Sequence, residues 1–396
     1  MTSMDYRSTL SVCLLICLIG AHLLGFWRDL RDGWKHSRTG ARLKSQNALI
    51  IVTASDVVGI LSLTTVSIIG SILCWKYVQT IIDKLVDCDE KLGIVSSKKI
   101  RRYTILLTLC SLLYSIVLSC LDIYTWNYEA KLNKKLNDKG PIDYVPLYFM
   151  YIVIIMMEVQ YAVATYNVCQ RFCKLNKNVE NILKSGRITD QFRKDLGLDG
   201  KSFSDSISQL MTVHASLCDT VLLINAAYGV VALVITITCL IHLIITPYVL
   251  IMEVDGRREP LFFAVQGLWC IFHIWRLLMI VQPTYAATTQ GKKTAVLVSQ
   301  LLSMSSDREE KKQLEIFSLQ LLHRPLEFSA CGLFILDRTL VTSIAGAVTT
   351  YLVILIQFQK DDDTKGSFDN ILKNATQMLK NASTFHNFTA GRFGLN

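Results

Sequence analysis

Long runs of apolar residues alternate with short polar connections along most of this chain. A window of about 19 residues finds segments that are long enough to cross a bilayer as helices. We expect membrane spans over residues 9–27, 48–75, 104–125, 145–168, 217–245, 261–283 and 333–358. The pattern predicts an all-α, polytopic membrane protein with seven helices, placed in the plasma membrane.

Composition supports a lipid environment, because 51% of the residues are hydrophobic and only 18% are charged. The net charge of +9 does not indicate a nucleic-acid partner, since the basic residues are dispersed among the connections. The 12 cysteines include no Cys-x-x-Cys pair, and no histidine cluster has the spacing of zinc ligands. We therefore expect no metal, no cofactor and, without a paired nucleophile and base, no enzyme.

The topology follows from three Asn-x-Ser/Thr acceptors beyond the last apolar segment, at Asn374, Asn381 and Asn387. If they carry glycans, the carboxyl terminus is extracellular, and seven spans place the amino terminus inside the cell. Basic connections 76–103, 171–211 and 284–325 are then cytoplasmic, as the positive-inside rule requires. The basic connection 28–46 conflicts with this rule. A cleaved signal peptide over residues 1–21 is an alternative that leaves the later topology unchanged.

The sixth apolar segment carries the strongest candidates for ligand binding. Gln266, Trp269 and His273 recur at three and four residues, so they share one helix face. An apolar wall with a few hydrogen-bonding groups and an indole suits a small polar ligand, although a seam between helices would have the same pattern. Arg276 lies deeper in the segment and either pairs with Glu158 or extends toward the interface.

Further candidates lie in other segments. A carboxylate such as Glu158 within a bilayer costs a few kcal/mol, so it requires a partner. Asp56 faces a cavity or caps its helix at the interface, and His242 binds ligand or only stabilises the bundle. The additional ligand-binding candidates are Asp56, Tyr151, Glu158 and His242.

The last apolar segment contains small and polar residues that a helix surrounded only by lipid does not need. Counting back from Gln357 at helical spacing reaches Val353 or Ile354 and then Thr350, which defines a face suited to a water-filled pore. Gln357 can replace part of a cation's water shell, and Phe358 lies about 100° around the helix. Beyond the helix, an acidic run forms either an outer ring that attracts cations or a solvated end, at Asp361, Asp362 and Asp363.

The same segment carries a family resemblance. Residues 350–358 read TYLVILIQF, in which Thr350-Tyr351 and Gln357-Phe358 enclose five hydrophobic residues. This matches the signature of the insect gustatory receptor family. Residues 328–334, FSACGLF, and Asp337 resemble the sequence that leads into the last helix of that family.

The resemblance implies a taste receptor that is itself a nonselective cation channel. Its partners would be a small-molecule tastant, lipid, permeating cations and other subunits, in a homotetramer or in a heteromer with other gustatory receptors. A Ser306-x-x-Glu309 capping box predicts a cytoplasmic helix with Leu314, Phe317 and Leu321 on one stripe. In the family it would be the first half of a broken seventh helix that holds the tetramer together.

Four regions follow. Residues 1–283 would form the ligand-sensing bundle, 284–332 the cytoplasmic subunit-packing region, 333–358 the pore-lining helix and 359–396 the extracellular glycosylated tail. A G-protein-coupled receptor is the first alternative, but its Asp-Arg-Tyr and Asn-Pro-x-x-Tyr motifs are missing from the expected positions. A secondary transporter is the second alternative, and we detect no internal repeat that would favour it. The sequence leaves open whether the tastant is a sugar or a bitter compound.

Overall fold

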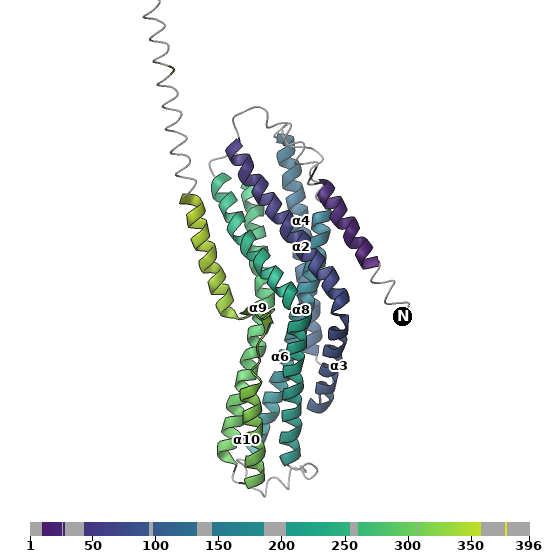
Figure 1. The fold of residues 1–396 in the computed structure, drawn as a ribbon, viewed down its shortest axis with the longest axis vertical. Coiled ribbons are helices and arrows are strands. Elements are labelled where there is room, and N and C mark those ends of the chain that lie inside the picture. Colours follow the sequence, from purple (N-terminus) through teal and green to yellow (C-terminus); the bar gives the residue numbers. More distant parts are fainter. Residues whose placement is uncertain are drawn as a thin grey trace, which may run out of the picture. The chain divides into compact units, whose positions relative to one another are not determined.

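The computed structural model describes residues 10–25, 27, 43–94, 98–132, 145–185, 203–253, 260–305, 307–357 and 377. It divides into two compact units, Met1–Ile344 and Ala345–Asn396. The described part is almost entirely helical (Figure 1). Its helices are Leu10–Gly25, α2 (Leu43–Leu73), α3 (Trp75–Leu92), α4 (Lys98–Leu132), α6 (Val145–Ser185), α8 (Phe203–Glu253), α9 (Pro260–Met304), α10 (Arg308–His323) and a last helix, Arg338–Gln357.

Every predicted membrane span contains a helix within the described residues. By length and composition, α4, α6, α8, α9 and the last helix can each cross a membrane. The segments Val57–Leu73 and Trp75–Leu92 qualify only as a pair, and a bend of 63° separates them. Helix Leu10–Gly25 is apolar but shorter than the others. The structure thus confirms a polytopic helical membrane protein.

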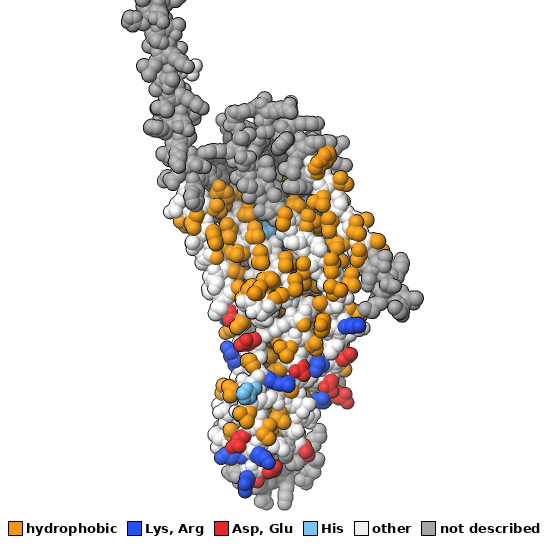
Figure 2. Space-filling view, in the orientation of Figure 1, with side chains coloured by type: hydrophobic (Ala, Val, Ile, Leu, Met, Phe, Trp, Pro, Cys, Tyr) orange, Lys and Arg blue, Asp and Glu red, His pale blue; other side chains and the backbone are white. Residues whose placement is uncertain are grey.

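Three helices of the first unit are much longer than the predicted spans. Helices α6, α8 and α9 have 41, 51 and 45 residues. At about 1.5 Å per residue they measure roughly 60–75 Å, about twice the thickness of a bilayer core. Figure 2 shows hydrophobic side chains over the half that includes α2, whereas charged side chains gather toward the end that includes α10. One end of the bundle therefore extends beyond the apolar layer.

Helix α9 passes through Pro283, where the predicted sixth span ends. Proline is tolerated inside such helices when neighbouring groups satisfy the freed backbone. The single proton of the Thr284 hydroxyl lies between two carbonyl oxygens, 2.7 Å from that of Val281 in the same helix and 2.6 Å from that of Leu336. The helix continues for about six more turns beyond Pro283, to Met304.

The predicted start of the last helix at Leu333 is wrong. Residues before it form a small antiparallel hairpin, β1 (Ser329–Ala330) and β2 (Phe334–Ile335), with Ser329 opposite Ile335. Cys331 and Gly332, with φ of 52° and 72°, turn the chain. The helix begins only at Arg338, because the Asp337 carboxylate accepts hydrogen bonds from the backbone N–H groups of Thr339 and Leu340.

Helix α10 is present where a cytoplasmic helix is predicted, but its cap differs. Asp307, not Ser306, is the N-cap, and its side chain accepts a hydrogen bond from the Glu310 N–H at 3.2 Å. The carboxylate competes better than a hydroxyl at this position, since it also interacts with the helix dipole. The predicted stripe is confirmed, because Leu314 and Phe317 are fully buried and Leu321 is half-buried.

Candidate functional site: a buried polar cluster and the last helix

The centre of the candidate site is an ion pair between α6 and α9. Arg276 donates to Oε1 of Glu158 from Nε at 2.8 Å and from Nη2 at 2.6 Å. Relative exposure of the two side chains is 1% and 0%. The sequence left open whether Arg276 pairs with Glu158 or extends to the interface, and the structure shows the pair. Removing one partner of such a pair leaves a buried charge, at a cost of about 3–5 kcal/mol.

Two histidines extend this polar layer toward α8. Arg276 Nη1 lies 3.3 Å from Nδ1 of His273, and the His273 ring lies 4.2 Å from the ring of His242. His242 Nδ1 is 2.7 Å from the carbonyl oxygen of Thr238. Because a carbonyl only accepts, the proton of His242 sits on Nδ1, and because the guanidinium only donates, Nδ1 of His273 is its acceptor. The layer has a defined hydrogen-bond direction.

Aromatic rings cover this polar layer. The Trp269 ring lies 5.0 Å from that of Tyr151 and 5.5 Å from that of Phe272, and Tyr114 stacks on Phe272 at 5.6 Å. The Tyr114 hydroxyl donates to the carbonyl oxygen of Leu268 at 2.9 Å. Helices α4, α6 and α9 thereby contribute to one aromatic group. The rings contact one another, so a ligand that enters between them must displace Trp269 or Tyr151 from its present rotamer.

The structure brings together five of the seven ligand-binding candidates, namely Tyr151, Glu158, His242, Trp269 and His273. Gln266 is half-buried on the same helix, about one turn before Trp269, and its amide forms no hydrogen bond within the described part of the chain. Asp56 lies in α2, but its side chain is outside the described residues. Further along α2, a Cβ added at Gly59 would lie 2.6 Å from Cγ2 of Thr238 and 3.7 Å from the His242 ring, so this part of α2 packs against α8 beside His242.

Two members of the cluster are not among the sequence-based candidates. Tyr114 is an ordinary aromatic residue in an apolar segment, so nothing in its immediate sequence separates it from lipid-facing neighbours. Phe272 has one usable signal, its position three residues after Trp269 on the same helix face. The role of Tyr114 depends on how α4 packs beside α9, which periodicity alone does not specify.

The last helix has the smallest buried share among the five helices that can each cross a membrane. Only 6% of its most apolar window is buried. Thr350, Tyr351, Val353, Ile354 and Gln357 all lie in the helix, with Ile354 among the exposed large hydrophobic residues. The Thr350 hydroxyl donates to the carbonyl oxygen of Gly346 at 2.9 Å. The remaining predicted pore, acidic and glycosylation residues lie outside the described residues: Phe358, Asp361, Asp362, Asp363, Asn374, Asn381 and Asn387.

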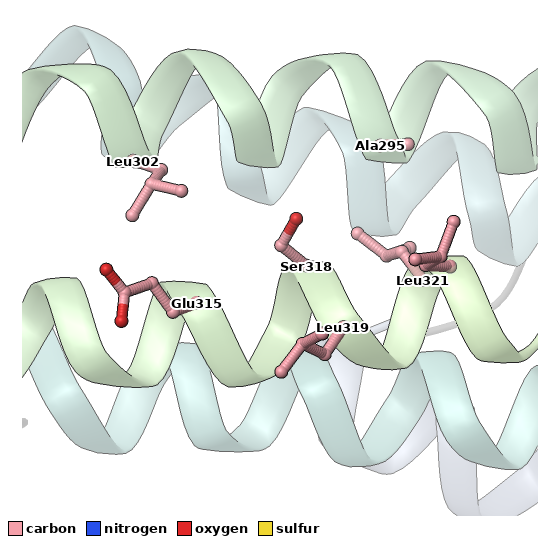
Figure 3. Close-up of a pocket in the computed structure, with 7 residues that line it drawn as sticks. Ala295, Leu302, Glu315, Ser318, Leu319 and Leu321 are labelled. Atoms are coloured by element: carbon pink, nitrogen blue, oxygen red, sulfur yellow. The ribbon is translucent and has the colours of Figure 1, made fainter.

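A hollow of about 580 Å³ lies elsewhere, between α9 and α10, and Figure 3 shows Glu315 and Ser318 of α10 facing α9 across it. Its lining consists of Ala295, Leu302, Glu315, Ser318, Leu319, Leu321 and Leu322. Leu319 and Leu322 are 57% and 73% exposed, so α10 carries an apolar outer side as well as its buried stripe. This hollow is separate from the predicted ligand-binding residues.

Asp337 caps the last helix in its charged form. Hydrogen bonds from the Thr339 hydroxyl and from the backbone N–H groups of Leu340 and Thr339 hold the pKa of Asp337 below its usual value. The carboxylate is therefore charged at neutral pH, where it stabilises the positive end of the helix dipole.

Comparison with known proteins gives independent evidence about the family of this chain. The family described as "7tm Chemosensory receptor" matches residues 9–362. The gustatory receptor for sugar taste 43a of Drosophila melanogaster is 28% identical over 373 residues, covering 82% of this chain and 84% of that protein. The putative gustatory receptor 28b of the same species is 29% identical over 223 residues, covering 51% of this chain and 47% of its own length.

Among solved structures, the insect olfactory receptor OR5 from Machilis hrabei in complex with eugenol has a TM-score of 0.60 at 13% identity. The match covers 89% of each chain. A second structure of the insect olfactory receptor OR5 from Machilis hrabei has a TM-score of 0.57, and that match covers 88% of each chain. At this level of identity the likeness shows a shared fold.

Proposed function

The chain belongs to the insect gustatory receptor family of seven-transmembrane chemosensory receptors, and from this premise we propose that it is a tastant-gated, nonselective cation channel. The observation that carries the proposal is the last helix. It is apolar enough to span a membrane, contains hydroxyl and amide side chains, and is 6% buried within one chain. Four such helices around a common axis would direct the polar side chains to water and the remaining surface to protein or lipid.

In the proposed orientation the amino terminus is cytoplasmic and the tail after Gln357 is extracellular. Glycosylation at Asn374, Asn381 and Asn387 would require this orientation. The charged end of the bundle, which carries α10, would then project into the cytoplasm. Helix α10 would pack against other subunits of a homotetramer or heteromer, because its exposed Leu319 and Leu322 need an apolar partner away from lipid.

The tastant would bind at the buried cluster. Trp269 offers an indole face, Gln266 an amide without a hydrogen-bond partner among the described residues, and His273 a ring held by Arg276. Such a set suits a ligand with hydroxyl groups above an apolar ring face. The gustatory receptor for sugar taste 43a is a relative over most of this chain, which supports a sugar over a bitter ligand. Asp56, Tyr151, Glu158 and His242 would complete or support the pocket.

Gating would involve the extracellular end of the last helix. Rings of Val353 and Ile354 close a narrow pore by excluding water, whereas Gln357 amides coordinate a passing cation. If the helix includes Phe358, this ring would lie about 100° around the axis from Gln357, and a modest rotation would exchange a ring for an amide at the pore axis. Asp361, Asp362 and Asp363 would concentrate cations at the entrance.

The decisive experiment is patch-clamp recording from a non-neuronal cell that expresses the chain, with sugars and bitter compounds applied under G-protein blockade. We expect a ligand-evoked cation current that persists under the blockade and changes its ion preference with Gln357→Ala. A response that disappears under the blockade would instead favour a G-protein-coupled receptor. Transport of ligand without a channel current would favour a secondary transporter.

A further inference from the structure

The segment Arg324–Leu336, here called the linker, joins α10 to the last helix and contacts two helices of the bundle. On α8, the side chain of Asn225 binds the linker backbone in two directions. Its Nδ2 donates to the carbonyl oxygen of Glu327 at 2.9 Å, and its Oδ1 accepts from the N–H of Ser329 at 3.2 Å. The Asn225 amide thus bonds the backbone next to β1 as a neighbouring strand would. These two bonds fix the position of β1 along α8 and its direction.

The contact with α8 continues one helical turn further. Gly229 lies against the turn of the hairpin, and an added Cβ there would stand 3.1 Å from the backbone nitrogen of Cys331. Earlier in α8, Asp219 accepts from Nη1 of Arg324 at 3.0 Å. Both charged side chains of this pair are partly exposed, so its contribution to stability is small. Asn225 is therefore the main polar attachment of the linker to α8.

On α9 the attachment is fully buried. The Thr284 hydroxyl lies 2.6 Å from the carbonyl oxygen of Leu336, and Thr284 is 0% exposed. Nearer the charged end, Gly291 leaves room for Leu326, whose Cδ2 would be 2.9 Å from an added Cβ. Arg338 reaches the amide oxygen of Gln282 at 3.2 Å. The linker is consequently attached to α8 at Asn225 and to α9 at Thr284.

The linker is also compact in itself. The Leu336 N–H donates to the carbonyl oxygen of Phe328 at 2.8 Å, and Phe328, Ala330 and Leu336 are buried. The last helix begins two residues after Leu336, at Arg338. A displacement of the linker therefore moves the first turn of the last helix with it, because only one residue separates the two.

We infer that Asn225 and Thr284 are positioning residues through which relative movement of α8 and α9 reaches the last helix. The inference rests on the proposed channel function. His242 belongs to α8, whereas Trp269 and His273 belong to α9, so a ligand at the cluster changes the spacing of the same two helices. A ligand shifts the equilibrium only by its different affinity for the two arrangements, and the linker converts that difference into movement of the last helix.

The test compares paired variants by single-channel recording with the agonist found for the wild type. Asn225→Ala and Thr284→Val remove the attachments, whereas Thr284→Ser keeps the hydroxyl and serves as the matched control. We expect the half-maximal agonist concentration to rise by about fivefold or more in the first two variants. Unitary conductance and ion preference should stay at wild-type values, and Thr284→Ser should behave as wild type.

Each other outcome contradicts the inference. Wild-type agonist dependence in Asn225→Ala and Thr284→Val would show that the linker contacts do not affect gating, and an altered conductance would assign them to the pore itself. Loss of both variants from the cell surface, with Thr284→Ser retained, would assign them to folding alone. Absence of current from the wild type would refute the proposed channel, whereas wild-type current with unaffected variants refutes only the inference.

Discussion

Both donor contacts from Arg276 to Glu158 end on the same oxygen, Oε1, while Oε2 of Glu158 is buried without a hydrogen-bond partner among the described residues. The carboxylate therefore depends on a single arginine for its compensation. The same arginine also orients His273 through Nη1. This relationship joins the stability of the bundle to the geometry of the candidate ligand cluster.

Arg276→Gln should destabilise the receptor by about 3–5 kcal/mol, because it leaves Glu158 buried and unpaired. The double variant Glu158→Gln with Arg276→Gln should lose less, since no isolated charge remains. Thermal denaturation of the detergent-purified protein, followed by size-exclusion chromatography, measures both. Lys293→Gln is the control, because it breaks an exposed 2.8 Å pair with Glu180 whose contribution to stability is small. An equal loss in the control would contradict the expectation.

Trp269→Ala should weaken the agonist response by about tenfold or more, because it removes the ring that faces Tyr151. Trp275→Ala, on the same helix with an exposed ring, is the matched control and should retain the wild-type dose dependence. Calcium imaging with surface biotinylation separates binding from expression. If both substitutions shift the response equally, the cluster is not the binding site.

Substitution of each Asn in the three acceptor sequences by Gln should remove one glycan, so the expressed receptor should run at a lower apparent mass on an electrophoresis gel. The affected residues are Asn374, Asn381 and Asn387. Peptide-N-glycosidase should collapse the wild-type ladder to the position of the triple variant. Protease added to intact cells should cut the tail. A tail that is unglycosylated and cleaved only after the cells are opened would reverse the proposed orientation.

Leu319→Ser with Leu322→Ser should lower the tetramer fraction of the purified protein, because both residues form the apolar outer side of α10. Val86→Ser on α3 replaces a comparably exposed apolar residue and serves as the control. Native mass spectrometry after gentle detergent extraction gives the fraction directly. An unchanged tetramer in the double variant would exclude α10 from the subunit interface.

Asp337→Ala should destabilise the start of the last helix by about 1 kcal/mol at neutral pH, since it removes the N-cap. Asp337→Asn should retain most of that stability. The folded-state pKa of Asp337 lies below its unfolded value, so its contribution is present above the unfolded pKa and is lost as the pH falls through the folded pKa. Hydrogen exchange at residues 339–344, measured from neutral to acidic pH, should show this loss in the wild type and not in Asp337→Asn.

The sequence predicts the helices well because each apolar run is long and has no competing pattern. It underestimates α6, α8 and α9, since a hydropathy window stops at the first charges although helix packing continues beyond the membrane. Pro283 marks no boundary, since α9 continues through it to Met304. Helix ends of this kind depend on contacts far away in the sequence.

The candidate site was predictable where a helix face repeats, as for Trp269 and His273, and where a buried charge demands a partner, as for Glu158. Tyr114 and the attachment at Asn225 were not predictable, because they arise from packing between segments. Asn225 is one amide in a long apolar helix, and its role becomes visible only when Glu327 and Ser329 are placed beside it.

The positive φ values at Cys331 and Gly332 also constrain how this sequence can diverge. Position 331 should accept glycine, asparagine or aspartate in natural variants and exclude valine, isoleucine and threonine, whose branched side chains disfavour that conformation. Replacement of Gly332 by any residue with a side chain should be rarer still. Two adjacent positions outside every helix thus evolve under a steric rule that concerns neither taste ligand nor ion.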